Sequence, residues 1–255
     1  MLKCYPINYA KFHCTGFLRT RYFSTESIKM AGHSKKLIIW DLDGVLADTE
    51  RMWMYNRMRA VNKLYGFSWD FETTVAHFDG RNGMDVDNTL KSLGIEDRSA
   101  FWKYTRRLDE KIFQNGIKAT YGIKRMLQNI NTPFCIATGD TLERTRKKIA
   151  AMKIDKYFST DNIFTAVMVD KGKPAPDVYL LAAEKCGVPP ENCLVVEDSV
   201  VCFKAAQQTS MKFVAFIKNA FNRNYSENKI TELGISDIFT KSKDLFEFIK
   251  KECGQ

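Results

Sequence analysis

The chain has 255 residues and a formal net charge of +9, with 45% hydrophobic and 27% charged residues, which is typical of a globular protein. This length suffices for one large domain or for a core with a smaller insert, and no run of eighteen apolar residues predicts a membrane span. The basic excess does not indicate nucleic-acid binding, because no basic stripe interleaved with aromatic residues occurs in the body of the chain, so attraction of small anionic substrates is the better interpretation.

The N-terminal segment has the composition of a targeting sequence. Residues 1–25 contain four basic residues and no acidic one, together with Ser, Thr and scattered aromatic residues. This composition is typical of a mitochondrial transit peptide, and the Arg-Tyr-Phe-Ser segment at 21–24 resembles a presequence cleavage site. We therefore predict that residues 1–30 direct the protein to mitochondria. The alternatives are a disordered basic tail, or translation from Met30, which would leave the protein in the cytoplasm.

The predicted secondary structure begins with an apolar run at 37–40, which is typical of a buried strand followed by a turn. Residues 51–117 carry apolar side chains at helical spacing and no convincing strand, and Gly66, Gly94 and Gly116 can end successive helices. From residue 118 onward, short apolar runs alternate with helical patterns. Strands are predicted at 133–137, 163–167, 193–196 and 213–217, and helices at 123–130, 142–152, 177–186 and 200–208, with Asp177 as a helix cap.

The alternation of strands and helices predicts an α/β fold in which helices cover both faces of a parallel sheet. The core would comprise residues 34–50 and 118–255, and the helical block at 51–117 would be an insert after the first strand. The seven cysteines are widely spaced, odd in number and form no CxxC pair, so the sequence indicates neither a disulfide framework nor a zinc site. A reducing compartment fits this pattern best.

Polar residues follow four of the predicted strands. They are Asp41 and Asp43 after the first strand, Thr138, Gly139 and Asp140 after the next, Lys173 in the loop that follows Val167, and Glu197 and Asp198 after the strand at 193–196. In an open parallel sheet these positions converge on one rim. Carboxylates that lie close together need a cation to stay ionised, and hard oxygen ligands suit Mg²⁺. A lysine and a hydroxyl beside them would bind a phosphoryl group.

These segments resemble the motifs of the haloacid dehalogenase-like hydrolases, over roughly residues 36–240. The first motif is matched by Asp-Leu-Asp-Gly-Val-Leu-Ala-Asp-Thr-Glu at 41–50, the second by Thr138, the third by Lys173 in Gly-Lys-Pro-Ala-Pro-Asp, and the fourth by Glu197 and Asp198. The order and spacing match the family, and the subfamily is the one with a helical cap, similar to β-phosphoglucomutases and sugar phosphatases. The resemblance implies a three-layer Rossmann-like core with a helical cap at 51–117.

The resemblance also implies a role for each motif residue. Asp41 would attack phosphorus and form an aspartyl-phosphate, and Asp43 would act as general acid and then as general base. Thr138, the Gly139 N–H and Lys173 would hold the phosphoryl oxygens. Magnesium would be held by the Asp41 carboxylate, the Asp43 carbonyl and Asp198, with Glu197 among the ligands or close to them. We interpret Asp140 as a loop acid, and Asp48 and Thr49 as residues that fix the turn before the insert.

A helical cap closes over the site and contacts the leaving group, which implies a small soluble phosphomonoester as substrate. Arg81, in a polar loop, and Trp53 are the candidate substrate contacts from the insert, and their alternative role is packing or simple surface exposure. The nearest rival function is a phosphomutase of the β-phosphoglucomutase type. Such mutases carry a His where Trp53 stands and an Arg where Gly83 stands, so both departures favour net hydrolysis. A non-catalytic binding protein on the same fold is the second rival.

Overall fold

Six parallel strands form one sheet in the order β3-β2-β1-β4-β5-β6. The strands are β1 (Leu37–Trp40), β2 (Phe134–Thr138), β3 (Ile163–Thr165), β4 (Cys193–Glu197), β5 (Lys212–Phe216) and β6 (Ile238–Phe239). The computed structural model describes residues 36–79, 81, 83–200, 202–221 and 223–255, so the predicted targeting segment at 1–30 lies outside the described residues. All described residues belong to one compact unit, Lys35–Gln255.

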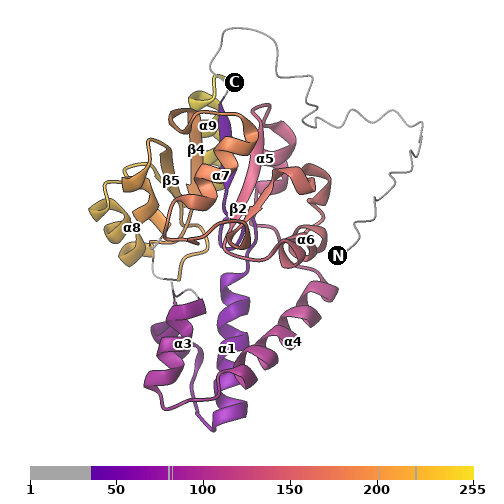
Figure 1. The fold of residues 1–255 in the computed structure, drawn as a ribbon, viewed down its shortest axis with the longest axis vertical. Coiled ribbons are helices and arrows are strands. Elements are labelled where there is room, and N and C mark those ends of the chain that lie inside the picture. Colours follow the sequence, from indigo (N-terminus) through magenta and orange to yellow (C-terminus); the bar gives the residue numbers. More distant parts are fainter. Residues whose placement is uncertain (1–35, 80, 82, 201, 222) are drawn as a thin grey trace, which may run out of the picture. The chain divides into compact units, whose positions relative to one another are not determined.

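Helices cover both faces of the sheet, because successive residues of a strand point to opposite sides. Ile38 and Trp40 of β1 pack against one set of helices, and Leu37 and Ile39 pack against the other. The first set is α5 (Ile123–Asn129), α6 (Leu142–Ala151) and α9 (Ser242–Glu252), and the second is α7 (Asp177–Cys186), the 3-10 helix η6 (Cys202–Gln208) and α8 (Arg223–Glu232). The predicted three-layer α/β architecture is therefore confirmed, and Figure 1 shows its elements around the sheet.

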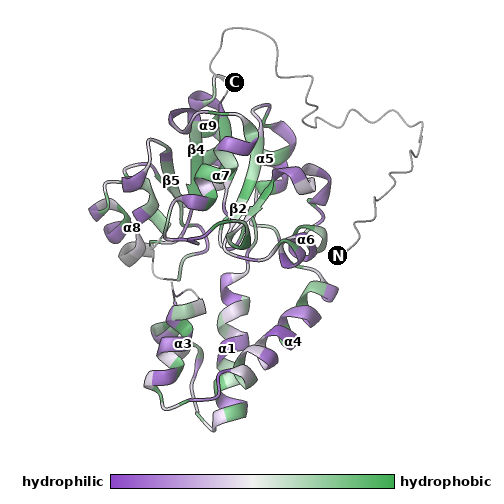
Figure 2. Cartoon of the chain, viewed as in Figure 1, coloured by the Kyte–Doolittle hydropathy of each residue, from purple (hydrophilic) through white to green (hydrophobic). Residues whose placement is uncertain are grey.

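Between β1 and α5 the described residues form helices and no strand. The helices are α1 (Glu50–Tyr65), α2 (Phe71–Phe78), α3 (Gly83–Ser92) and α4 (Ser99–Asn115). They bury a small core of their own, which includes Met54, Val61, Leu90 and Phe101. In Figure 2 the strands of the sheet are mostly hydrophobic, whereas α1 and α4 carry many hydrophilic residues, as expected for helices that bury only one side.

Some local predictions differ from the structure. The strand expected at 163–167 ends at Thr165, and the helix expected at 200–208 is a 3-10 helix. Asp177 does not cap α7: it is the first helical residue, the N-cap is Pro176, and no side chain bonds there. Among the described residues, no helix has the length and apolarity needed to cross a membrane.

Candidate active site

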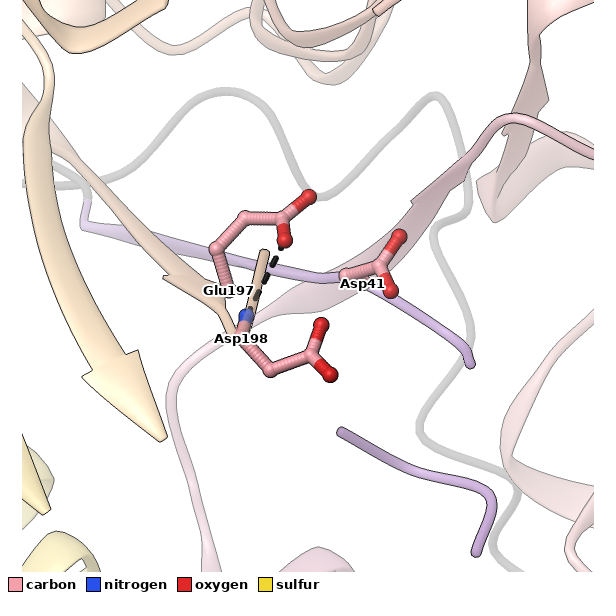
Figure 3. Close-up of side chains that lie close together, drawn as sticks. All are labelled: Asp41, Glu197 and Asp198. Carbon is pink, nitrogen blue, oxygen red and sulfur yellow. Dashed lines mark hydrogen bonds between the residues drawn. The ribbon is translucent and has the colours of Figure 1, made fainter. Parts of the chain in front are cut away.

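The centre of the sheet brings three carboxylates together. Strand β1 pairs with β4, and the Asp41 N–H donates to the Val196 carbonyl at 3.0 Å, so Asp41 lies beside Glu197 and Asp198 at the ends of the two strands. One carboxylate oxygen from each of the three residues lies within 4.8 Å of the others. Figure 3 shows these side chains gathered at one place from the two strands. The three carboxylates predicted as metal ligands or neighbours of the metal therefore converge, and the fourth predicted ligand, the Asp43 carbonyl, belongs to the backbone and not to this side-chain group.

Lys173 lies against the carboxylates, as its motif predicts. Its Nζ is 2.5 Å from Asp41 Oδ1 and 2.5 Å from Glu197 Oε1, and only 9% of the side chain is exposed. Burial alone would lower the pKa of Lys173, but the attraction of Asp41 and Glu197 raises it above its ordinary value. Lys173 is therefore a fixed positive charge beside the candidate nucleophile.

Glu197 is held by four donors. Its Oε1 accepts from Lys173 Nζ and, at 2.6 Å, from the Tyr179 hydroxyl, and its Oε2 accepts from the N–H groups of Asp198 at 3.0 Å and Ser199 at 3.3 Å. Burial would raise the pKa of Glu197, but the charge and hydrogen bond of Lys173 outweigh it and lower the pKa. Because both oxygens are already engaged, Glu197 suits an anchoring position close to a metal better than direct ligation.

Asp41 and Asp198 have excess negative charge around them. Burial and repulsion from Glu197 raise the pKa of Asp41 to about 7, although Lys173 acts in the opposite direction. Burial and repulsion from Glu197 also raise the pKa of Asp198 well above its ordinary value. A divalent cation between the two carboxylates would remove this cost, and their oxygen atoms are the donors that such a hard cation prefers. The residues present therefore fit a divalent metal.

Gly44 lets Asp198 approach the first motif. Its φ of +84° lies in the left-handed region, and a Cβ built there would fall 1.8 Å from Asp198 Oδ2. Any other residue would displace this carboxylate. The Gly44 carbonyl accepts from Asn219 Nδ2 at 2.9 Å, and the same Nδ2 lies 2.9 Å from Thr120 Oγ1, so the loop is also held from the side of β5.

Asp43 is held by two groups, one on each oxygen. Thr49 Oγ1 donates to Oδ1 at 2.7 Å, which agrees with a turn-fixing role for Thr49, and Lys148 Nζ lies 2.5 Å from Oδ2. Lys148 could not be predicted from the sequence, because Arg-Lys-Lys at 146–148 resembles an exposed basic helix surface. Asp140 is also more than a loop acid, since it pairs with both Lys148 and Arg144.

Thr138 is the last residue of β2 and Gly139 follows it, next to β1, but neither lines the cavity at the site. Thr138 is 2% exposed, and its Oγ1 accepts from the Asp140 N–H at 3.2 Å. No atom lies within 4 Å of a Cβ built on Gly139, so space is open there. Both residues therefore lie at the end of the strand next to β1, but outside the lining of the cavity.

A cavity of about 370 Å³ lies between the strand ends and the helical insert. Seven of the nine predicted site residues line it: Asp41, Asp43, Trp53, Arg81, Lys173, Glu197 and Asp198. Four further residues line the same cavity without having been predicted as site residues: Glu50, which ends the first motif, and Arg57, Asp79 and Phe221. Arg81 is exposed, whereas Trp53 packs edge-on against Phe113 with the ring centroids 6.2 Å apart. The cavity joins the carboxylates to the insert, as a site with a substrate-contacting cap requires.

Comparison with known proteins agrees with this geometry. The chain is 26% identical over 191 residues to a phosphorylated carbohydrates phosphatase of Thermotoga maritima, covering 72% of this chain and 86% of that protein. It is 30% identical over 189 residues to a probable pseudouridine-5'-phosphatase of Drosophila melanogaster, covering 69% and 79%. A crystal structure of a conserved haloacid dehalogenase-like protein from Agrobacterium tumefaciens superposes with a TM-score of 0.74 and 25% identity, over 85% of this chain and 98% of that one. The family model of the haloacid dehalogenase-like hydrolases matches residues 38–216, and the chain belongs to this family.

Proposed function

We propose that the chain is a Mg²⁺-dependent phosphatase that hydrolyses a small phosphorylated metabolite through an aspartyl-phosphate on Asp41. The observation that carries the proposal is the contact between Lys173 and Asp41, 2.5 Å apart beside two further carboxylates and open to a cavity. The names of the phosphatase relatives support a phosphomonoester as substrate. Within that class we propose a sugar, sugar-acid or polyol phosphate.

Two proton transfers and two displacements make up the proposed reaction. An Asp41 oxygen attacks phosphorus, the bond to the ester oxygen breaks, and Asp43 gives that oxygen a proton. Asp43 then takes a proton from water, which attacks the phosphorus and releases inorganic phosphate and free Asp41. Lys173 binds the phosphoryl oxygens throughout and offsets their negative charge.

The metal site is proposed from the donor atoms of the described residues. Asp41 and Asp198 offer carboxylate oxygens, the Asp43 carbonyl is a third donor from the same turn, and Glu197 orients the site from its hydrogen-bonded position. Bound Mg²⁺ would shield the phosphoryl charge from the incoming carboxylate.

The test is phosphate release from a panel of phosphorylated metabolites, with and without Mg²⁺, by the wild-type protein and by Asp41→Asn. We expect Asp41→Asn to lose at least about 10³-fold in activity, because the nucleophile is gone. Asp48→Asn is the matched control, since Asp48 belongs to the same segment but is exposed. If Asp41→Asn kept the wild-type rate, the activity would come from a contaminant, and the chain would be the non-catalytic binding protein instead.

The phosphomutase alternative predicts a different product. Trp53 lines the cavity at the position where those mutases carry a His, which favours hydrolysis. Incubation with a labelled sugar phosphate is expected to release free inorganic phosphate. Label that remains on the sugar at a new position would favour the mutase.

We also propose that the protein works in mitochondria, on the composition of residues 1–25. A fusion of residues 1–30 to a fluorescent reporter is expected to enter mitochondria. A diffuse cytosolic signal would contradict this and favour translation from Met30.

A further inference from the structure

Lys148 is a buried charge next to the candidate acid–base residue. It lies on α6 with 2% of its side chain exposed, whereas 39% of the neighbouring Lys147 side chain is exposed. Its Nζ lies 2.5 Å from Asp43 Oδ2 and 2.7 Å from Asp140 Oδ2, and 5.0 Å from the Trp53 ring centre. A buried ammonium is costly unless such partners offset the loss of water.

The ion pairs continue from Lys148 into the helical insert. Arg144 Nε is 3.1 Å from Asp140 Oδ1, and Arg144 Nη2 is 3.1 Å from Asp109 Oδ2 on α4. Asp109 is 5% exposed, and its other oxygen accepts from Asn56 Nδ2 of α1 at 2.8 Å. An unbroken series of ion pairs therefore runs from Asp109 on α4 through Arg144, Asp140 and Lys148 to Asp43, and Asn56 of α1 joins it through a neutral hydrogen bond.

This series of ion pairs holds the carboxylate of Asp43, which must reach the leaving oxygen of the substrate. Thr49 and Lys148 hold different oxygens of Asp43, so together they set the plane of the carboxylate, while 25% of the side chain stays exposed. A well-packed apolar side chain at 148 would cost less to bury than a lysine, so stability alone gives no reason for a charge there. The ammonium group of Lys148 instead serves to hold the Asp43 carboxylate.

We propose that Lys148 is a positioning residue for Asp43, and that Asp140, Arg144 and Asp109 link this position to the helical insert. The proposal rests on the proposed phosphatase function, in which Asp43 gives a proton to the leaving oxygen. It predicts that loss of Lys148 lowers kcat/KM most for esters whose leaving oxygen must be protonated as it departs.

The experiment compares Lys148→Met with wild type on two esters, p-nitrophenyl phosphate and an alkyl phosphate such as a hexose phosphate. Nitrophenolate departs without a proton, whereas an alkoxide does not. We expect kcat/KM for the alkyl ester to fall about 10²-fold, as for loss of general acid catalysis, and that for the aryl ester to fall less than about tenfold. Lys147→Met, on the same helix and paired with Glu110 of the insert, is the control and should change neither.

A double-mutant cycle with Asp43→Asn separates positioning from a structural role. If Lys148 acts through Asp43, Lys148→Met should cause no further loss of kcat/KM in the Asp43→Asn protein. Equal losses on both esters, or an undiminished further loss in the Asp43→Asn protein, would overturn the proposal. Absence of activity on both esters in wild type would instead refute the phosphatase function.

If Lys148→Met does not fold, Arg144→Met tests whether the ion pairs position Asp43. The Arg144 side chain is 22% exposed, so its removal disturbs packing less. We expect the same preference for the aryl ester, with a several-fold loss of kcat/KM on the alkyl ester. An equal loss of kcat/KM on the two esters would overturn the proposal that these ion pairs connect the insert to Asp43 and that Lys148 positions Asp43.

Discussion

At the scale of single residues, Gly44 gives the sharpest prediction. In Gly44→Ala, the added methyl group would overlap Asp198 Oδ2, so the Asp198 carboxylate must leave its present position. We expect Mg²⁺ affinity to fall at least about tenfold, as when a metal ligand loses its support. Isothermal titration calorimetry with Mg²⁺ measures this affinity.

Gly66→Ala is the matched control for Gly44→Ala. Gly66 has a similar φ of +74°, but no atom lies within 4 Å of the added methyl group. This variant should lose about 1–2 kcal/mol of stability from the left-handed backbone and keep its Mg²⁺ affinity. Equal Mg²⁺ affinity in both variants would refute the steric argument for Gly44.

Tyr179 tests the anchoring of Glu197. Tyr179→Phe removes one donor to a fully buried carboxylate, and hydrogen bonds to charged groups contribute about 1.5–3 kcal/mol. We expect the free energy of unfolding to fall by that amount in urea titrations. Tyr121→Phe, at a residue 83% exposed, should leave it unchanged. A loss below about 0.5 kcal/mol in Tyr179→Phe would mean that Lys173 and the two backbone N–H groups suffice.

The sequence predicted residues with a motif and missed residues without one. Asp41, Lys173, Glu197 and Asp198 each follow a strand within a recognisable pattern, and they meet as expected. Lys148 and Tyr179 lie within helices, where only the rotation of the helix against the sheet decides which side chains face the site. That rotation depends on tertiary packing, which local sequence does not encode.

At the scale of elements, the helical insert is expected to control substrate affinity. Arg81 lines the cavity and is exposed, so Arg81→Ala should raise KM by about tenfold, equivalent to 1.4 kcal/mol, and leave kcat nearly unchanged. Arg59→Ala is the control, because Arg59 is an exposed arginine of α1 outside the cavity. An unchanged KM in Arg81→Ala would mean that Arg81 is an exposed residue that does not contact the substrate.

Element types were easier to predict than element ends. The runs that form β1, β2, β4 and β5 are apolar except at one end of β2, β4 and β5, because helices cover both faces of the sheet. The segment at 202–208 has the apolar spacing of a helix, yet it forms a 3-10 helix between the Glu197 loop and β5. The two-residue strand β6 is too short for any periodic pattern.

At the scale of the whole molecule, metal binding should contribute to stability. Asp41, Glu197 and Asp198 repel one another, so removal of Mg²⁺ by a chelator should abolish activity and lower the melting temperature. Mg²⁺ at a hundred times its dissociation constant should restore activity and add about 2.7 kcal/mol to the free energy of unfolding. Differential scanning calorimetry measures the shift. In Asp198→Asn the same addition should cause little change, and a full shift there would place the metal elsewhere.

The strand order also determines when each strand meets its partners during synthesis. Leu37–Trp40 is made early, but its neighbours β2 and β4 are made only after the four helices of the insert. The buried core of the insert is built from residues within 54–101, so it can assemble while β1, which directly precedes Asp41, still has no partner strand. No nascent chain that ends before Asp198 holds all three carboxylates, so the three can meet only after β4 and the residue that follows it have been synthesised.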